Sequence, residues 1–281
     1  MSTHDEIYKT QLSDFFRDLG AEVDASINAY KVELTNFFAS LSPALDIAER
    51  AQAELDRTAA TQFTVFKYFS KQERTQEIYL SRIFGDLLNP SGNHGQGVRF
   101  LQLFLDELTR WNDEWSKKLR GVIPNMSLKG CKTHLEFPTP EGRRVDVVLE
   151  VPLEGKNDVF RIGIENKPWA GDQDEQIADY LKALLEKSPG NARVLYFSGN
   201  GKEPSEAALG KLEKWERDLC LTVPYRCNSR GYPSLENWIQ QDREQCEAER
   251  VRWFLKDLLE YIKSQFEIPA QTEPETEENK A

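Results

Sequence analysis

Three residues able to bind a metal ion and activate water lie close together in the sequence. Glu165 and Lys167 end an apolar run typical of a β-strand. Strand side chains alternate between the two faces, so these two residues share a face while Asn166 points to the other. Asp146 lies in the preceding apolar run. If the polar segment between the runs forms a turn, the strands pair as a hairpin and Asp146 reaches the face of Glu165.

Two neighbouring carboxylates repel each other unless a cation lies between them. Oxygen ligands of this kind suit Mg²⁺ or Mn²⁺, and the Asn166 carbonyl offers a further ligand from the strand backbone. The Lys167 ammonium group would orient or help to activate water and stabilise the charge that builds on a phosphate. The pattern therefore indicates metal-dependent phosphodiester hydrolysis, with DNA as the expected substrate. The alternative is an ion pair at the end of an edge strand.

The Glu-x-Lys pattern alone is weak evidence, because it occurs three times: Glu154 to Lys156, Glu165 to Lys167 and Glu278 to Lys280. The first copy falls in an expected turn and the third in a polar tail. Only the middle copy closes an apolar strand, follows a strand aspartate 19 residues earlier and leads into a helix. The context, rather than the motif, favours a catalytic site.

The helix expected after this strand carries two further candidates. Asp172, with Glu175 three residues later, is typical of a helix start with a capping box. Gln176 and Tyr180 are four residues apart and so share a helix face. Gln176 would bond either a phosphate or a site carboxylate, and Tyr180 would stack or bond nearby. Ordinary helix surface is the alternative for both.

Taken together, Asp146, Glu165-x-Lys167 and Gln176-x-x-x-Tyr180 resemble the PD-(D/E)XK nuclease superfamily, in the branch that adds a Gln-x-x-x-Tyr helix. The resemblance implies metal ligation by Asp146 and Glu165 and a catalytic role for Lys167. It also implies that Gln176 and Tyr180 bind substrate or order the site.

The segments IGIENKPWAGDQDEQIADY and HGQGVRFLQLFL are similar to a bacterial group within that superfamily, and the resemblance covers about residues 72–265. It suggests a restriction or phage-defence setting. One departure is Val145, which stands before Asp146 where other members have proline, at a position that varies in the superfamily.

Two more residues are candidates with open alternatives. Glu77 lies seven residues before Phe84 and shares its inward face on an expected amphipathic helix, Lys71–Leu88. It is either a third acidic group at the metal site or a partly solvated residue favoured by the helix dipole. His94, in a glycine-rich loop, either ligates a metal or contacts DNA, or is simply solvated.

The expected elements predict an α/β fold with a restriction-endonuclease-like core, αβββαβ, in which helices flank a central mixed sheet. Three strands of a meander are expected at Cys131–Phe137, Arg143–Val151 and Val159–Glu165. A crossover helix from Asp172 and a strand at Ala192–Ser198 follow. A helix at 205–217, a strand at Leu221–Cys227 and closing helices at Leu235–Phe266 complete the domain, whose expected bounds are 71–266.

Residues 1–70 are expected to be a helical extension, broken at Ser42-Pro43, and 267–281 a disordered acidic tail. The extension is either an arm for oligomerisation or a partner protein, or a helical layer on the core. The net charge of −11 lies mainly at the ends, since residues 1–60 carry 11 acids and 5 bases. The near-neutral centre leaves room for a local phosphate-binding surface.

The chain shows no run of 18 apolar residues and no signal-peptide start, which predicts a cytoplasmic protein without a membrane partner. Its four cysteines show no zinc-site spacing. Two alternatives to a DNA nuclease stay open. One is a nuclease-like scaffold that binds nucleic acid or a partner protein without cutting, and the other is a nuclease acting on RNA.

Overall fold

The computed structural model describes residues 3–59, 76–111, 113–155, 158–169, 171–228 and 231–269, and a five-stranded mixed sheet is its central feature. The strands follow one another in chain order across the sheet. β1, β2 and β3 are antiparallel neighbours, whereas β3, β4 and β5 are parallel. Their bounds are β1 Lys132–Pro138, β2 Arg144–Pro152, β3 Val159–Lys167, β4 Ala192–Ser198 and β5 Cys220–Pro224.

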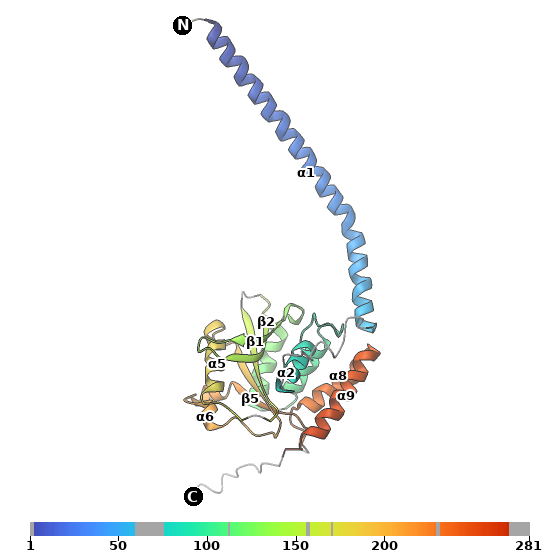
Figure 1. Cartoon of the computed structure of the whole chain (residues 1–281), viewed down its shortest axis with the longest axis vertical. Helices are drawn as coiled ribbons and strands as arrows, with labels where there is room; N and C mark the ends of the chain where they lie inside the picture. The colour runs from blue at the N-terminus through green and yellow to red at the C-terminus, as the bar shows by residue number, and fades with distance from the viewer. Residues whose placement is uncertain are drawn as a thin grey trace. The chain divides into compact units, whose positions relative to one another are not determined.

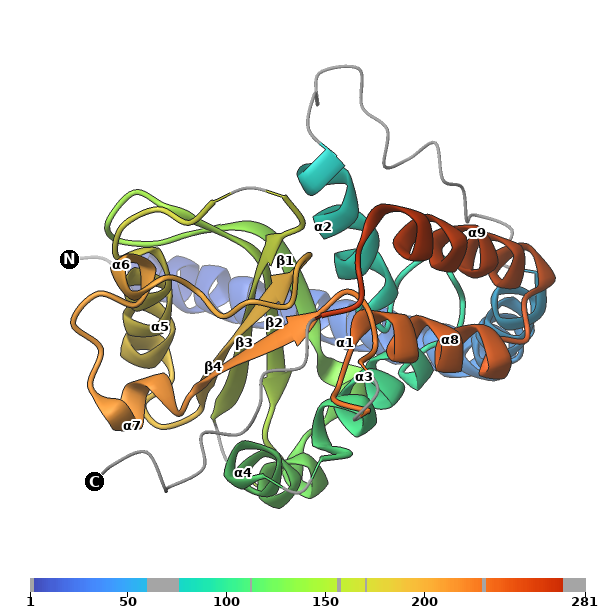
Figure 2. The same ribbon diagram turned by 90° about the horizontal axis from the view of Figure 1, so that it is seen from below.

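Helices cover both faces of the sheet (Figure 2). On one face, α5 and α6 pack with apolar residues of β2 and β4, and on the other face α2, α3, α4, α8 and α9 share a larger core with β2, β3 and β4. The bounds are α2 Gln76–Leu87, α3 Arg99–Thr109, α4 Glu114–Val122, α5 Gln176–Lys187, α6 Glu206–Leu209, α7 Lys214–Arg217, α8 Leu235–Gln245 and α9 Glu249–Gln265.

This arrangement confirms the predicted αβββαβ fold. β4 is buried along its whole length, as expected of a strand with helices on both faces. β1 lies at the sheet edge, and its residues are exposed or half-buried throughout. The crossover from β3 through α5 to β4 joins two parallel strands, so β3 and β4 end at the same edge of the sheet. The residues expected to do chemistry lie at that edge.

The N-terminal extension is one helix, α1, Thr3–Ala59, which bends part-way along its length (Figure 1). The predicted break at Ser42-Pro43 was wrong, because the helix continues through Pro43. The structure divides into two units, Met1–Glu54 and Leu55–Ala281. The expected boundaries at 70/71 and 266/267 stay predictions, since residues 60–75 and 270–281 lie outside the described ranges.

Local predictions failed where a tertiary contact replaced a local one. Asp172 does not cap α5, which begins four residues later, at Gln176. Its carboxylate instead accepts hydrogen bonds from the Tyr196 hydroxyl at 2.5 Å and the Ser205 N–H. α4 was not among the predicted elements; it forms because Asp113 caps it and it buries Trp115. The last strand ends early, at Pro224.

The sequence predicts no membrane span. None of the helices in the described ranges is both long enough and apolar enough to cross a bilayer.

Candidate active site

The site forms where β2 and β3 separate. Their paired register ends at Val147 and Ile164. Beyond that point the Asn166 N–H donates to Asp146 Oδ2 at 2.8 Å. A side-chain carboxylate thus takes the place of a strand carbonyl as acceptor. Asp146 and Glu165 therefore face the opening between the strands.

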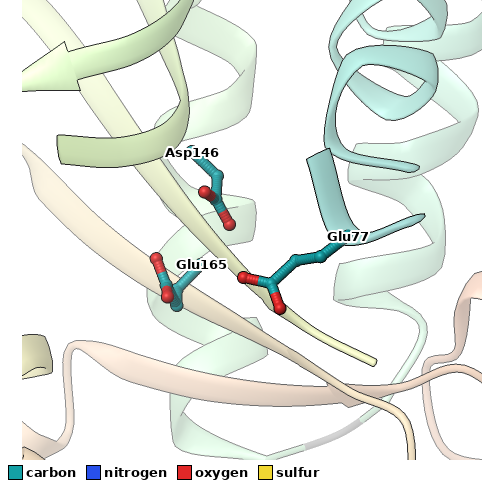
Figure 3. A group of neighbouring side chains, drawn as sticks. All are labelled: Glu77, Asp146 and Glu165. Carbon is teal, nitrogen blue, oxygen red and sulfur yellow. The ribbon is translucent and has the colours of Figure 1, made fainter. Parts of the chain in front are cut away.

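Glu77 completes a group of three carboxylates. It lies in the first turn of α2 and reaches the strands from the neighbouring helix (Figure 3). Glu77, Asp146 and Glu165 each offer one oxygen, and these oxygens all lie within 4.8 Å of one another. Among the described residues, buried Glu165 Oε2 has no hydrogen-bond partner. A buried oxygen without a donor is costly unless a cation satisfies it, so the cluster fits a divalent metal.

Lys167 is the cation of the cluster. Its Nζ lies 2.5 Å from Glu165 Oε1 and 3.2 Å from Glu77 Oε1, and its side chain is largely buried. Three ionised carboxylates and one ammonium group leave a net charge of −2. A single divalent ion would neutralise that charge, and Lys167 would remain beside it.

Gln176 and Tyr180 form a chain of hydrogen bonds that starts at Glu165. Gln176 Nε2 donates to Glu165 Oε1 at 2.7 Å and to the Tyr180 hydroxyl at 3.0 Å. The Tyr180 hydroxyl donates to the Arg144 carbonyl at 2.7 Å. Both side chains are buried. Of the two roles open to Gln176 from the sequence, the structure shows the contact with a site carboxylate.

Asn166 joins the site to the opposite face of the sheet. Its side-chain amide donates to Ser81 Oγ at 3.0 Å and to the Glu77 carbonyl at 3.3 Å, which fixes the start of α2 against β3. The buried Tyr225 hydroxyl donates to Asn166 Oδ1 at 2.6 Å. Ser81 and Tyr225 were not predicted from the sequence. The four-residue spacing of Ser81 from Glu77 was a usable signal, whereas nothing near Tyr225 indicated its partner.

The family is decided by comparison with known proteins. A family model described as the PD-(D/E)XK nuclease superfamily matches residues 63–279, most of the chain and the whole acidic cluster. The chain belongs to the PD-(D/E)XK nuclease superfamily. No curated protein and no solved structure matches it. The predicted family is confirmed, and its members are generally nucleases that use divalent metals.

Burial dominates the electrostatics of this PD-(D/E)XK site. Burial, and then repulsion from Glu165, raises the pKa of Asp146 to about 8. Burial raises the pKa of Glu165 to about 7, although attraction to Lys167 opposes the shift. Burial disfavours the Lys167 charge as well, but attraction to Glu165 and Glu77 outweighs it and raises the pKa of Lys167. Lys167 therefore stays charged at neutral pH.

Without metal, the stability of the fold should fall as pH rises from about 5 to 8. Free aspartate and glutamate ionise near pH 4, whereas Asp146 and Glu165 keep a proton to about pH 8 and 7. The folded state thus holds protons that the unfolded state releases, and raising the pH removes that advantage. Calorimetry in EDTA should show a Tm lower by a few degrees at pH 8 than at pH 6.

Adding Mn²⁺ should reverse this loss, and the rise in Tm should be larger at pH 8, where metal and protons compete least. The same scans on Asp146→Asn provide the control, because that variant lacks one of the two titrating groups. Equal pH dependence in wild type and variant would contradict the assignment.

Truncating Gln176 should weaken the site without unfolding the protein. Gln176→Ala removes a donor from Glu165 Oε1, and loss of such a contact typically lowers metal affinity or activity about 10- to 100-fold. Mn²⁺ titration and cleavage rates measure the effect, with Tm as the check on folding. Gln240→Ala is the matched control, since Gln240 bonds only Glu244 on its own helix among the described residues. Unchanged metal affinity in Gln176→Ala would remove its positioning role.

His94 is not brought to the acidic cluster. It is fully buried beyond the end of α2 opposite to Glu77, stacked on Phe100. Nδ1 accepts from the Gln96 N–H, and Nε2 lies 2.9 Å from the Asn89 carbonyl. Burial lowers the pKa of His94 and favours a neutral ring. The geometry explains a loop-ordering role, which neither sequence alternative included.

Proposed function

We propose that the chain hydrolyses phosphodiester bonds in DNA, using Mg²⁺ or Mn²⁺ held by Glu77, Asp146 and Glu165. One observation carries the proposal: among the residues that the structure describes, Glu165 Oε2 has no donor although it is buried inside a cluster of three carboxylates. Hydrogen bonds satisfy the Oε1 atom of the same residue, so the orphaned atom is the one left for a metal. The match to a nuclease superfamily supplies the reaction class.

Asn166 would contribute to this metal through its backbone. In a strand, the N–H and carbonyl of one residue point to the same side. The Asn166 N–H points to Asp146, so its carbonyl faces the same opening between β2 and β3. The side-chain bonds of Asn166 to Ser81 and Tyr225 hold that backbone in place.

A bound divalent ion would polarise the phosphate and lower the pKa of an attacking water. Lys167 would orient that water and stabilise the negative charge on the phosphate, because it keeps its charge and lies against two of the ligands. Gln176 would hold Glu165 in its ligating orientation, and Tyr180 would fix Gln176. In this proposal, Gln176 and Tyr180 are positioning residues and need no contact with substrate.

Trp169 is a proposed contact for the substrate. It follows Lys167 by two residues, is 49 % exposed, and stacks on Phe266 with ring centroids 5.3 Å apart. A half-exposed ring that is held on one side offers its free surface to a base, and such stacking tolerates any base. Trp169 was not predicted from the sequence.

The alternative function is a scaffold that binds nucleic acid or a protein without cutting. The ion pairs of Lys167 with Glu77 and Glu165 favour it, since they partly neutralise the acids without a metal. Among the described residues, the unpartnered Glu165 Oε2 argues against it. An RNA nuclease uses the same residues and is separated only by the substrate.

The test is cleavage of linear and circular DNA, single-stranded DNA and RNA, with Mg²⁺, Mn²⁺ or EDTA. The proposal expects metal-dependent cutting of DNA, and cutting of the circle would establish internal cleavage. Cutting of RNA alone would transfer the mechanism to the other substrate. Nucleic-acid binding without cutting, and with no Mn²⁺ detected by calorimetry, would support the scaffold.

The proposed setting is the bacterial cytoplasm. The cysteines Cys131, Cys220, Cys227 and Cys246 are free, which suits a reducing compartment. A restriction or phage-defence role stays a prediction from the resemblance.

A further inference from the structure

α1 carries an uninterrupted ladder of apolar residues. Starting at Leu12, steps of three or four residues reach twelve positions, and all twelve are apolar in a chain that is 39 % hydrophobic. The positions are Leu12, Phe16, Leu19, Val23, Ile27, Tyr30, Leu34, Phe37, Leu41, Ala44, Ala48 and Ala51. Such a run indicates a selected pattern rather than a chance one.

The period of the ladder identifies the kind of contact. From Val23 onward the steps are four and three in strict alternation, an average of 3.5 residues. That is the heptad repeat of a coiled coil, in which the twelve ladder positions form one seam that faces a second helix along its whole length. Leu19, Val23 and Ile27 are separated by two steps of four, the local irregularity that coiled coils tolerate as a stutter. Pro43 lies off the seam.

Within its own unit, Met1–Glu54, the helix leaves the seam uncovered. Its nine large side chains, Leu12 to Leu41, are 37–67 % exposed. Aromatic side chains alone bury roughly 150–250 Å² each when covered. Three aromatics and six aliphatics on each of two helices therefore exceed the roughly 1,000 Å² that a specific interface needs.

A second α1 matches the seam in length. Leu12–Ala51 spans 40 residues, or about 60 Å of helix. The longest other helix in the described ranges is α9, with 17 residues. A second copy of the chain supplies an equally long helix with the same heptads. Residues 1–60 carry 11 acids and 5 bases, which disfavours nucleic acid or an anionic membrane as the occupant.

We propose that α1 pairs with α1 of a second copy in a two-stranded coiled coil, so that the protein is a homodimer carrying two nuclease units. Twofold pairing is the commonest symmetry among soluble oligomers. The inference rests on the seam alone and goes beyond the proposed nuclease activity, since a scaffold would dimerise in the same way.

The test is the mass of the full chain in solution, measured by light scattering after gel filtration and by sedimentation equilibrium at about 1–50 µM. The wild type should have twice the chain mass of 32.4 kDa. The double variant Leu34→Glu, Leu41→Glu places two charges on the seam and should be monomeric, with its Mn²⁺-induced rise in Tm retained. Thr35→Glu, Ser42→Glu is the matched control, because the same charges fall one residue off the seam and should leave the dimer intact.

A monomeric wild type at 50 µM would overturn the proposal. The same holds for a monomer that sediments with vesicles of anionic lipid, since α1 would then bind a membrane and not a second copy. A dimer that persists in Leu34→Glu, Leu41→Glu would overturn it as well. Loss of the dimer in the control pair to the same extent would show that any added charge dissociates it, and would remove the heptad assignment.

Discussion

Replacing Lys167 with alanine should lower the cleavage rate about 10²- to 10³-fold while Mn²⁺ still binds. The side chain supplies the positive charge of the site but no metal ligand, and it lies 2.5 Å from Glu165 and 3.2 Å from Glu77. Removing it leaves the three carboxylates with more net negative charge, so Mn²⁺ affinity should be equal or higher. Single-turnover cleavage and Mn²⁺ calorimetry on the same preparation measure the two quantities.

Lys211→Ala is the matched control, because Lys211 is exposed and distant in sequence from the site residues. It should keep the wild-type rate and affinity. A Lys167→Ala protein that cuts at the wild-type rate would exclude Lys167 from the chemistry. One that loses both cutting and metal would indicate that the lysine maintains the site rather than acting in the reaction.

Asp146→Asn should strongly weaken metal binding and abolish cleavage while leaving the fold intact or more stable. The amide oxygen of asparagine can still accept the Asn166 N–H, so the contact that joins β2 to β3 survives. The buried repulsion with Glu165 disappears, and the pKa of Asp146, raised to about 8 by burial and that repulsion, shows that its charge is disfavoured. In EDTA at pH 8, the Tm of the variant should equal or exceed that of the wild type.

Mn²⁺ affinity in Asp146→Asn should fall at least about 100-fold, since a ligand is lost rather than a supporting contact. Asp218→Asn is the control, because Asp218 is exposed and is not part of the acidic cluster. Wild-type Mn²⁺ affinity in Asp146→Asn would mean that the ion binds elsewhere. A much lower Tm in EDTA would mean that the carboxylate is structural.

The central residues could be placed from the sequence because strand geometry is regular. Alternation put Glu165 and Lys167 on one face, and a hairpin brought Asp146 opposite, which the paired register of β2 and β3 bears out. The four-residue spacing of Gln176 and Tyr180 likewise placed them together, and they share a hydrogen bond. These inferences needed only local periodicity and one turn.

Residues brought in by tertiary packing were harder to place. Glu77 lies 69 residues before Asp146, and its helix face was equally consistent with solvent. The docking of α2 on β3 through Asn166 and Ser81 is what brings Glu77 to Asp146 and Glu165. His94 lies in a loop, where side-chain direction has no period. Asp172 matches the sequence pattern of a helix cap. It accepts a hydrogen bond from Tyr196 instead, because tertiary contacts override local preference.

The ladder on α1 is the opposite case. Its pattern is visible in the sequence, but the sequence did not decide what the apolar positions contact. Its helical spacing was recognised, yet two alternatives stayed open because a packed layer and a coiled coil share apolar periodicity. The 3.5-residue step favours a second helix as the partner of α1, and the solution mass of the chain separates the two alternatives.

The most direct test of the central claim is plasmid cleavage by wild type and Asp146→Asn, each with Mn²⁺ and with EDTA. The metal site at Glu77, Asp146 and Glu165 predicts cutting only by the wild type with Mn²⁺. Equal cutting by the variant, or cutting by the wild type in EDTA, would contradict the claim that these carboxylates hold a catalytic metal.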